Sequence, residues 1–208
     1  MASASQGGTA DGRTAGRILE AARVCLLDTG FARLSTRRIA EQAGLPLSQL
    51  HYHFGSKGRL VLAVLDAENA RLLERQASMY GGQAPLWKQW EQACDFLDDD
   101  LRSGYVRVLQ EMIAAGWSDT AVAEAVRRDL LGWYELLCDV GRRAADRFGG
   151  LGPFAPEEVA ALAGNVFLGT EALILLGLDE EALPSRSALR KVGQIIRRLE
   201  EGDGDARV

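Results

Sequence analysis

The hydrophobic and polar positions of this chain follow a helical period almost throughout. Apolar residues recur three and four positions apart, as they do on one face of an α-helix, and no alternating stretch typical of a β-strand persists. Glycines and prolines mark the ends of these segments. The pattern predicts an all-α protein with helices at about 13–29, 35–42, 46–53, 56–79, 85–101, 103–115, 119–148, 156–178 and 185–200.

The same pattern divides the chain into two predicted domains. The pair Gly81-Gly82 interrupts the helical period and marks the boundary between them. We assign residues 13–58 to an N-terminal domain of three helices, which the long helix at about 56–79 joins to a helical domain at 80–201. Residues 1–12 are predicted to be a disordered tail, and residues 202–208 a frayed one.

Residues 34–60 carry the most specific local pattern. They predict two short helices joined by a tight turn and followed by a longer helix. Ser35 is suited to cap the first helix, and Gly44 supplies a turn conformation that a residue with a Cβ resists. Leu50 and Phe54 then fall on one side of the second helix. This is the layout of a helix-turn-helix, whose second helix can lie in the DNA major groove.

The same run resembles the N-terminal domain of the tetracycline-repressor (TetR) family. The matching positions are Gly30, Phe31, Thr36, Ile39, Ala40, Ala43, Gly44, His53, Phe54, Ser56, Lys57 and Leu60. The match spans about residues 13–65 and is strong, because the H-F-x-S-K ending rarely follows an I-A-x-x-A-G turn at this distance by chance. The chain departs from the family at Pro46, where Ser or Thr is usual, at Ser48 in place of Gly, and at His51 in place of Tyr.

The resemblance implies that the helix at 46–53 reads DNA. We expect Leu47, Ser48, Gln49, His51 and Tyr52 to face outward or toward the duplex. Gln49 can form paired hydrogen bonds with an adenine edge, and Ser48 can bond several base edges. Leu47 either touches a thymine methyl group or packs against its own domain.

A second set of residues is better placed to contact phosphates, which positions a protein on DNA without reading its sequence. This set contains Thr36, Arg37, Tyr52, His53 and Lys57. Lys57 lies at the start of the long helix, where free backbone N–H groups also favour an anion.

The charge distribution fits DNA held at one end of the protein only. The whole chain has a formal net charge of −5. Residues 11–59, however, hold eight basic and four acidic side chains, a net charge of +4, so the remainder carries −9. A basic head on an acidic body is typical of a DNA-binding protein, although chance variation in surface charge would produce the same values.

Composition and cysteine usage indicate a soluble, cytoplasmic protein. The chain is 47% hydrophobic and 25% charged, as ordinary globular domains are. No run of about 18 apolar residues predicts a membrane span, and the N-terminus lacks the basic start and apolar core of a secretory signal. Cys25, Cys94 and Cys138 are few and widely spaced, which fits reduced thiols better than a disulfide framework.

The sequence contains no motif of catalysis or metal binding. There is no G-x-S-x-G, G-x-x-x-x-G-K-[ST] or H-E-x-x-H pattern. The two histidines, His51 and His53, lie two positions apart, and such residues on a helix point about 200° from each other. They cannot readily share an ion, and no further ligand completes a site. We therefore expect no enzyme activity, no metal and no cofactor.

Aromatic residues gather in the predicted C-terminal domain. Core packing is their default role, but a helical domain with four tryptophans can also enclose a cavity for an apolar ligand. The family resemblance implies an effector pocket in this part of the chain. The candidate lining residues are Trp87, Trp90, Cys94, Tyr105, Met112, Trp117, Trp133 and Leu137.

The last two predicted helices carry more apolar residues than one buried face requires. Such an excess predicts a homodimer in which each subunit contributes two helices, as in the family. The candidate interface residues are Phe167, Thr170, Ile174, Leu175, Val192 and Ile196. The alternative is a central helix buried within a monomer.

These features together predict a dimeric transcriptional regulator that binds double-stranded DNA. We expect a repressor that leaves a palindromic operator when a small apolar ligand binds. Two alternatives are a DNA-binding regulator without a small-molecule effector, and a helical ligand-binding protein or enzyme that has lost DNA binding. Whether the regulator represses or activates depends on the position of its operator.

Overall fold

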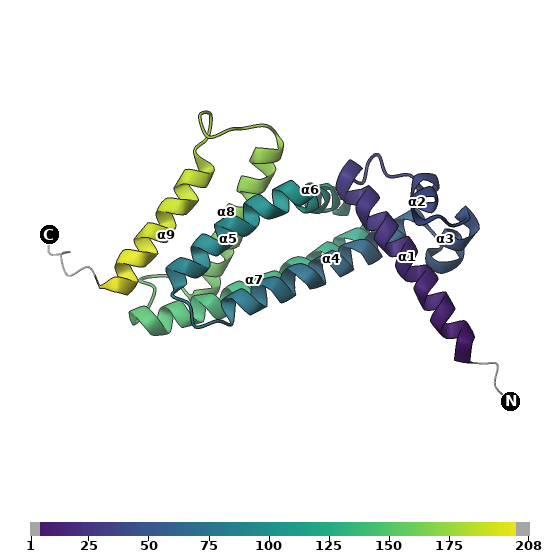
Figure 1. Ribbon diagram of the computed structural model, residues 1–208. Coiled ribbons are helices and arrows are strands. Elements are labelled where there is room, and N and C mark those ends of the chain that lie inside the picture. The colour runs from purple at the N-terminus through teal and green to yellow at the C-terminus, as the bar shows by residue number, and fades with distance from the viewer. Residues whose placement is uncertain (1–4, 203–208) are drawn as a thin grey trace. The chain divides into compact units, whose positions relative to one another are not determined.

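The computed structural model describes residues 5–202, with side chains from Asp11 onward. No strand is present within this range, and the all-α prediction is confirmed. The helices are α1 (Ser5–Thr29), α2 (Thr36–Ala43), α3 (Leu47–Phe54), α4 (Lys57–Tyr80), α5 (Leu86–Ser103), α6 (Tyr105–Gly116), α7 (Thr120–Phe148), α8 (Pro156–Leu175) and α9 (Ser185–Glu201) (Figure 1).

The first helix differs most from its predicted limits. α1 begins at Ser5 rather than near Arg13, so the predicted N-terminal tail is helical from Ser5 onward, and residues 1–4 lie outside the described range. Extending an existing helix fixes one residue at a time and costs far less than nucleating a new one. At the other end, α9 closes at Gly202 in the left-handed conformation. The remainder of the predicted C-terminal tail lies beyond the described residues.

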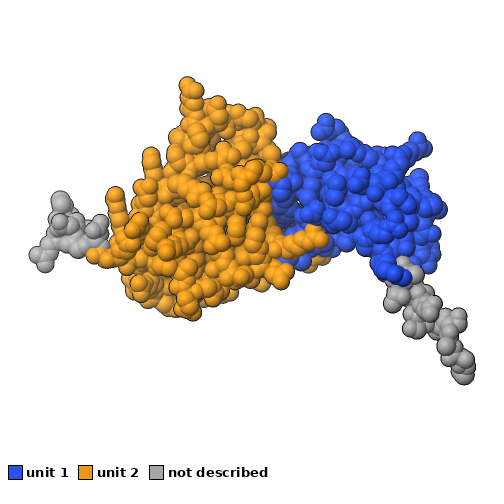
Figure 2. Space-filling model, in the orientation of Figure 1, with its two compact units in different colours: residues 1–70, 103–127 blue, residues 71–102, 128–208 orange. Residues whose placement is uncertain are grey.

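The chain forms two compact units, coloured differently in Figure 2. The first contains the described residues up to Ala70 together with Ser103–Arg127. The second contains Arg71–Arg102 and the chain from Arg128 onward. This grouping differs from the sequence-based limits, which placed all of 80–201 in one domain. The physical reason is that α6 packs against α1.

Two side chains of α6 hold it to the end of α1. The Arg107 guanidinium donates a hydrogen bond to the Leu27 carbonyl, and the Glu111 carboxylate accepts one from the Phe31 N–H. Gly104, just before α6, has φ +85°, and a Cβ there would stand 2.3 Å from the Leu27 carbonyl oxygen. The approach of α6 to α1 therefore requires glycine at this position.

The core of the first unit draws on α1, α2, α3, α6 and the start of α4. Its least exposed large side chains, all below 2%, are Ile18, Leu26, Ile39, Leu50, Leu60, Val61, Val64, Leu65, Val106, Val108 and Met112. Burial of each such side chain contributes about 1.5–3 kcal/mol. The helix-turn-helix therefore rests on a well-packed base.

The second unit is a helical bundle in which α8 and α9 run antiparallel, joined by the loop at 176–184 (Figure 1). The Trp90 indole N–H of α5 donates to the Leu189 carbonyl of α9 at 2.7 Å. The ring of Trp90 also meets Phe167 of α8 edge to face, with centroids 5.5 Å apart. Trp90 thereby joins α5, α8 and α9.

Candidate nucleic-acid interface and ligand cavity

The turn between α2 and α3 is set by local backbone geometry. Gly44 has φ 61° and ψ 40°, and its N–H donates to the Glu41 carbonyl at 3.0 Å. The Arg17 guanidinium of α1 donates to the Ala43 carbonyl at 2.8 Å, so a cation satisfies the end of α2. Pro46 occupies the N-cap of α3, and the helix begins one residue later than predicted.

The second helix of the helix-turn-helix, α3, has one fully buried side chain. Leu50 is 1% exposed and is the one buried residue of this eight-residue helix. Ser48, Gln49, His51 and Tyr52 are exposed, and Tyr52 is 74% exposed. A row of polar side chains thus faces solvent, while a single leucine ties the helix to the core.

Two of the predicted DNA contacts are less accessible than this row. Leu47 is half-buried. The His53 side chain is 7% exposed, with its Nε2 atom 3.6 Å from the Asp11 carboxylate and its ring edge-on to Tyr52, with centroids 5.0 Å apart. In this arrangement His53 supports the ring of Tyr52 from inside the domain.

The residues predicted to contact phosphates at the helix starts differ in their exposure and in the bonds they already form. Thr36 is the first residue of α2 and half-buried, whereas Arg37 is exposed and forms no ion pair with any described residue. The Lys57 ammonium donates a hydrogen bond to the Phe31 backbone carbonyl at 3.2 Å. The same ammonium lies 4.8 Å from the centre of the Phe31 ring. Lys57 therefore holds the α1–α2 turn with part of its donor capacity.

The cap residues also differ from expectation. Ser35 stands at the N-cap of α2, but its side chain forms no capping hydrogen bond. Ser56 is the effective cap, because its Oγ accepts the Arg59 N–H at 3.2 Å in the first turn of α4. Arg59 is exposed, and its guanidinium lies close to Gly55, at the end of α3. It is an additional candidate phosphate contact, signalled in the sequence by its position two residues after Lys57.

The second unit contains an apolar cavity of about 240 Å³. It lies among α4, α5, α7, α8 and α9 and the segment after α7. Its lining residues are Tyr80, Leu86, Gln89, Trp90, Ala93, Leu137, Val140, Gly141, Ala144, Phe148, Leu151, Val159, Ala160, Ala163, Phe167, Ile196 and Leu199. None of these carries a formal charge, so the cavity suits an apolar guest.

The structure brings two of the eight predicted pocket residues, Trp90 and Leu137, to this cavity. Cys94 and Trp133 belong to the neighbouring packed clusters and do not line it. Three more of the predicted pocket residues lie away from this cavity. Tyr105 and Met112 are buried in the first unit, and Trp117 is 84% exposed at the end of α6. Aromatic composition predicts which part of the chain holds the cavity, but it does not predict which side chains line it.

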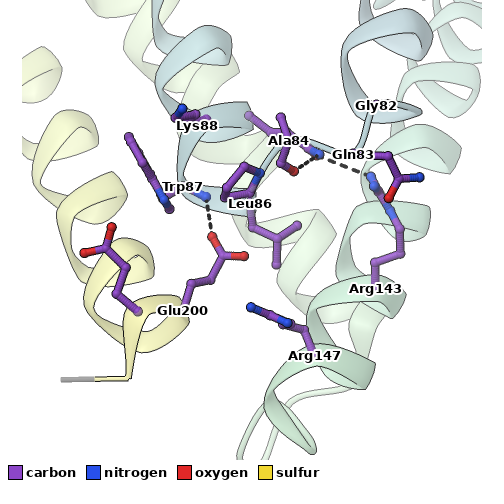
Figure 3. A pocket seen from close by; sticks show the side chains of 12 residues that line it. Gly82, Gln83, Ala84, Leu86, Trp87, Lys88, Arg143, Arg147 and Glu200 are labelled. Atoms are coloured by element: carbon purple, nitrogen blue, oxygen red, sulfur yellow. Dashed lines mark hydrogen bonds between the residues drawn. The ribbon is translucent and has the colours of Figure 1, made fainter. Parts of the chain in front are cut away.

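Trp87 lies instead at a separate surface pocket of about 490 Å³ (Figure 3). Its backbone N–H donates to the Glu200 carboxylate at 2.9 Å. Its ring is covered by Lys88 and Arg197, whose charged groups lie 5.3 and 4.7 Å from the ring centre. Its indole is therefore engaged in surface contacts.

The helix-turn-helix segment matches a known family. The model of the bacterial regulatory proteins of the tetR family fits residues 18–64, which include the turn, α3 and its buried Leu50. An uncharacterized HTH-type transcriptional regulator of Mycobacterium bovis is 28% identical over 196 residues, covering 86% of this chain and 94% of the relative. The N-terminal domain of the chain, over residues 18–64, belongs to the TetR family. This TetR-family protein is a DNA-binding transcriptional regulator.

One further relative is similar over the head of the chain, and two solved structures share its fold. The HTH-type transcriptional repressor AcnR of Corynebacterium efficiens is 37% identical over 57 residues, which are 27% of this chain and 30% of AcnR. A transcriptional regulator of Saccharomonospora viridis, solved with choline, has a TM-score of 0.71 at 18% identity and covers 88% and 94% of the two chains. FadR of Bacillus subtilis, solved with stearoyl-CoA, has a TM-score of 0.68 at 12% identity and covers 90% and 98%.

The apolar surface of this TetR-family protein lies on α8 and α9. The large apolar residues exposed there are Leu162, Val166, Leu175, Val192, Ile195 and Leu199. Of the six predicted interface residues, Leu175 and Val192 belong to this surface, and Ile174 is half-buried. Phe167 and Thr170 are buried within the single chain, and Ile196 is half-buried beside the cavity, which the exposed Leu199 also lines. The predicted set therefore falls partly on exposed and partly on buried faces of α8 and α9.

By length and composition, α8 is the one described helix that could cross a membrane. Composition alone is weak evidence for a span, because a helix that packs in a subunit interface has the same properties.

Proposed function

We propose that this protein is a cytoplasmic repressor that binds a palindromic operator as a homodimer and leaves it when a small, largely apolar ligand binds. The observation that carries the proposal is the exposed polar row on α3, formed by Ser48, Gln49, His51 and Tyr52 over the buried Leu50. The major groove admits an α-helix and presents a distinct pattern of hydrogen-bonding groups for each base pair. The name of AcnR, a repressor similar over the head region, favours repression.

The residues of the head sort into two roles in this proposal. Gln49 and Ser48 read base edges, since an amide can pair with adenine and a hydroxyl can bond several bases. Arg37, Thr36 and Lys57 lie near the starts of α2 and α4 and contact phosphates, which sets the register of the protein on the duplex. The Lys57 ammonium has three N–H donors, and one of them bonds the Phe31 carbonyl, so the others can bond a phosphate.

The remaining predicted contacts take supporting roles. Tyr52 extends from the exposed row toward the backbone of the duplex. His53 holds the Tyr52 ring from behind, consistent with its buried, edge-on position. Leu47, half-buried at the start of α3, both packs and offers its methyl groups to a thymine.

The homodimer follows from the exposed apolar surface of α8 and α9. Leu162 and Val166 lie four positions apart on α8, and Val192 and Ile195 lie three apart on α9, so each pair shares one helix face. A second copy of the same surface covers them in an isologous interface. Two heads then address half-sites about one helical turn apart, which explains why the operator should be palindromic.

The ligand response rests on the cavity of the second unit. The structural neighbours solved with choline and with stearoyl-CoA are ligand-binding regulators of the same fold. A ligand in the 240 Å³ cavity would favour whichever spacing of the two heads leaves the cavity open. Release from the operator requires that the dimer with this head spacing bind DNA less tightly than the dimer with the other spacing.

The test is selection of duplexes from a random pool by the purified full-length protein. We expect recovery of an inverted repeat whose affinity falls steeply with salt concentration, because phosphate contacts release counterions. Recovery of single half-sites would contradict the dimer. Recovery of no sequence, even at low salt, would overturn the regulator function.

A further inference from the structure

One residue that lines the cavity of the second unit, Tyr80, carries a hydroxyl group without a protein partner among the described residues. Three of its lining residues, Tyr80, Gln89 and Trp90, have side chains that can donate hydrogen bonds. Gln89 donates to the Ala84 carbonyl at 2.9 Å and accepts from Arg143 at 3.4 Å. Trp90 donates to the Leu189 carbonyl. The Tyr80 hydroxyl forms no hydrogen bond with any described residue.

Tyr80 is also strongly buried. Its side chain belongs to the packed cluster of Met79, Leu137 and Ala160, and the residue is 8% exposed. Burial raises the pKa of the Tyr80 hydroxyl well above its usual value, so the phenol is neutral near pH 7 and can donate a proton to a hydrogen bond. A buried donor of this kind ordinarily has a partner.

The rest of the cavity wall restricts the partner. No Asp, Glu, Lys or Arg lines the cavity, and an isolated charge would be poorly solvated there. Its volume is about 240 Å³. The space suits a compact, mainly apolar molecule.

We propose that the effector is an uncharged, mainly apolar small molecule with one hydrogen-bond acceptor, such as a ketone, aldehyde or ester oxygen, and that Tyr80 donates to this acceptor. The inference rests on the proposed function, since it takes the cavity as the effector site. Tyr80 then determines specificity: it distinguishes a carbonyl compound from a hydrocarbon of the same shape. The cost of leaving its hydroxyl unpaired acts against the hydrocarbon.

Two probes of matched shape test this assignment. Acetophenone carries a carbonyl oxygen where α-methylstyrene carries a methylene group, and both are uncharged. Their affinities for the full-length protein are measured by titration calorimetry with the wild type and with Tyr80→Phe. The matched control is Tyr134→Phe, which removes a phenol that donates to Asn165 at 2.6 Å and does not line the cavity. Thermal unfolding shows that each variant is folded.

We expect the wild type to prefer acetophenone, and Tyr80→Phe to weaken acetophenone binding by about 3- to 10-fold, the range for one neutral hydrogen bond. Binding of α-methylstyrene should stay unchanged or improve, and Tyr134→Phe should leave the ratio of the two affinities as in the wild type. If both probes bind and the ratio does not change in Tyr80→Phe, the role of Tyr80 is refuted while the cavity stays a ligand site. If neither probe binds the wild type, the cavity is not an effector site, and both this inference and the ligand response fail.

Discussion

Leu50 should control the position of the recognition helix although it touches no DNA. It is the one buried residue of α3 and is 1% exposed, so Leu50→Ala removes three carbon atoms from a fully packed site. Loss of the transfer free energy together with the cavity left behind costs about 3–5 kcal/mol. The exposed row of α3 loses no atom in this variant.

The loss of stability in Leu50→Ala also weakens DNA binding. A destabilisation of about 3 kcal/mol changes the ratio of docked to undocked α3 by roughly 150-fold, since 1.4 kcal/mol is tenfold. Only the docked helix presents its polar row to the groove, so apparent affinity falls with the docked fraction. We expect Leu50→Ala to bind the selected duplex more weakly than the wild type, by at most about 150-fold, the limit reached when the undocked state predominates.

Urea unfolding measures the loss of stability, and fluorescence anisotropy at fixed salt measures the loss of affinity for the duplex. The matched control is Leu131→Ala on α7, which deletes the same atoms from a residue that is 55% exposed and should cost about 0.5 kcal/mol or less. The reasoning is refuted if Leu50→Ala costs no more than this control, or if its affinity for the duplex equals that of the wild type.

Three further tests, which use five variants, address other parts of the structure. Gln49→Ala should change which bases are preferred in the duplex selection, whereas Arg37→Ala should weaken all duplexes alike and reduce the salt slope by about 1; equal loss of specificity in both would reject this division of roles. Ile195→Glu places a charge on a residue that is 55% exposed on α9 and should convert the dimer to monomers in light scattering, and an unchanged dimer would remove this face from the interface. Gly104→Ala should lower the free energy of unfolding by at least about 2 kcal/mol, because φ is +85° and the new Cβ meets a carbonyl oxygen. Gly16→Ala, in open space on a helix, should instead stabilise by about 0.5–1 kcal/mol, and similar results for the two would contradict the argument.

Local signals were sufficient to predict most of the secondary structure. Each helix end other than the start of α1 lies within three residues of its predicted place, because glycine, proline and the helical period act over a few residues. The helix-turn-helix was predictable for the same reason. The left-handed conformation at Gly44 and the buried face of Leu50 depend on neighbours in the chain.

Residues at tertiary contacts could not be placed from the sequence in this way. The period of a helix shows which residues share a face, but not which of two apolar faces turns inward. On α8, Phe167 turns toward Trp90 and is buried, while Val166, one position earlier, is exposed. The helix turns by about 100° per residue, so a shift of one position decides whether a side chain is buried or exposed.

The sequence by itself determined the helices, the turn and the family of this protein, since all three reside in contiguous residues. Only the tertiary structure decided that α6 packs on α1 through Arg107 and Glu111, and that Tyr80 faces an apolar cavity. The two hydrogen bonds each join residues 80 positions apart. Their geometry depends on how whole helices pack, and that packing is a collective result of burying many side chains at once.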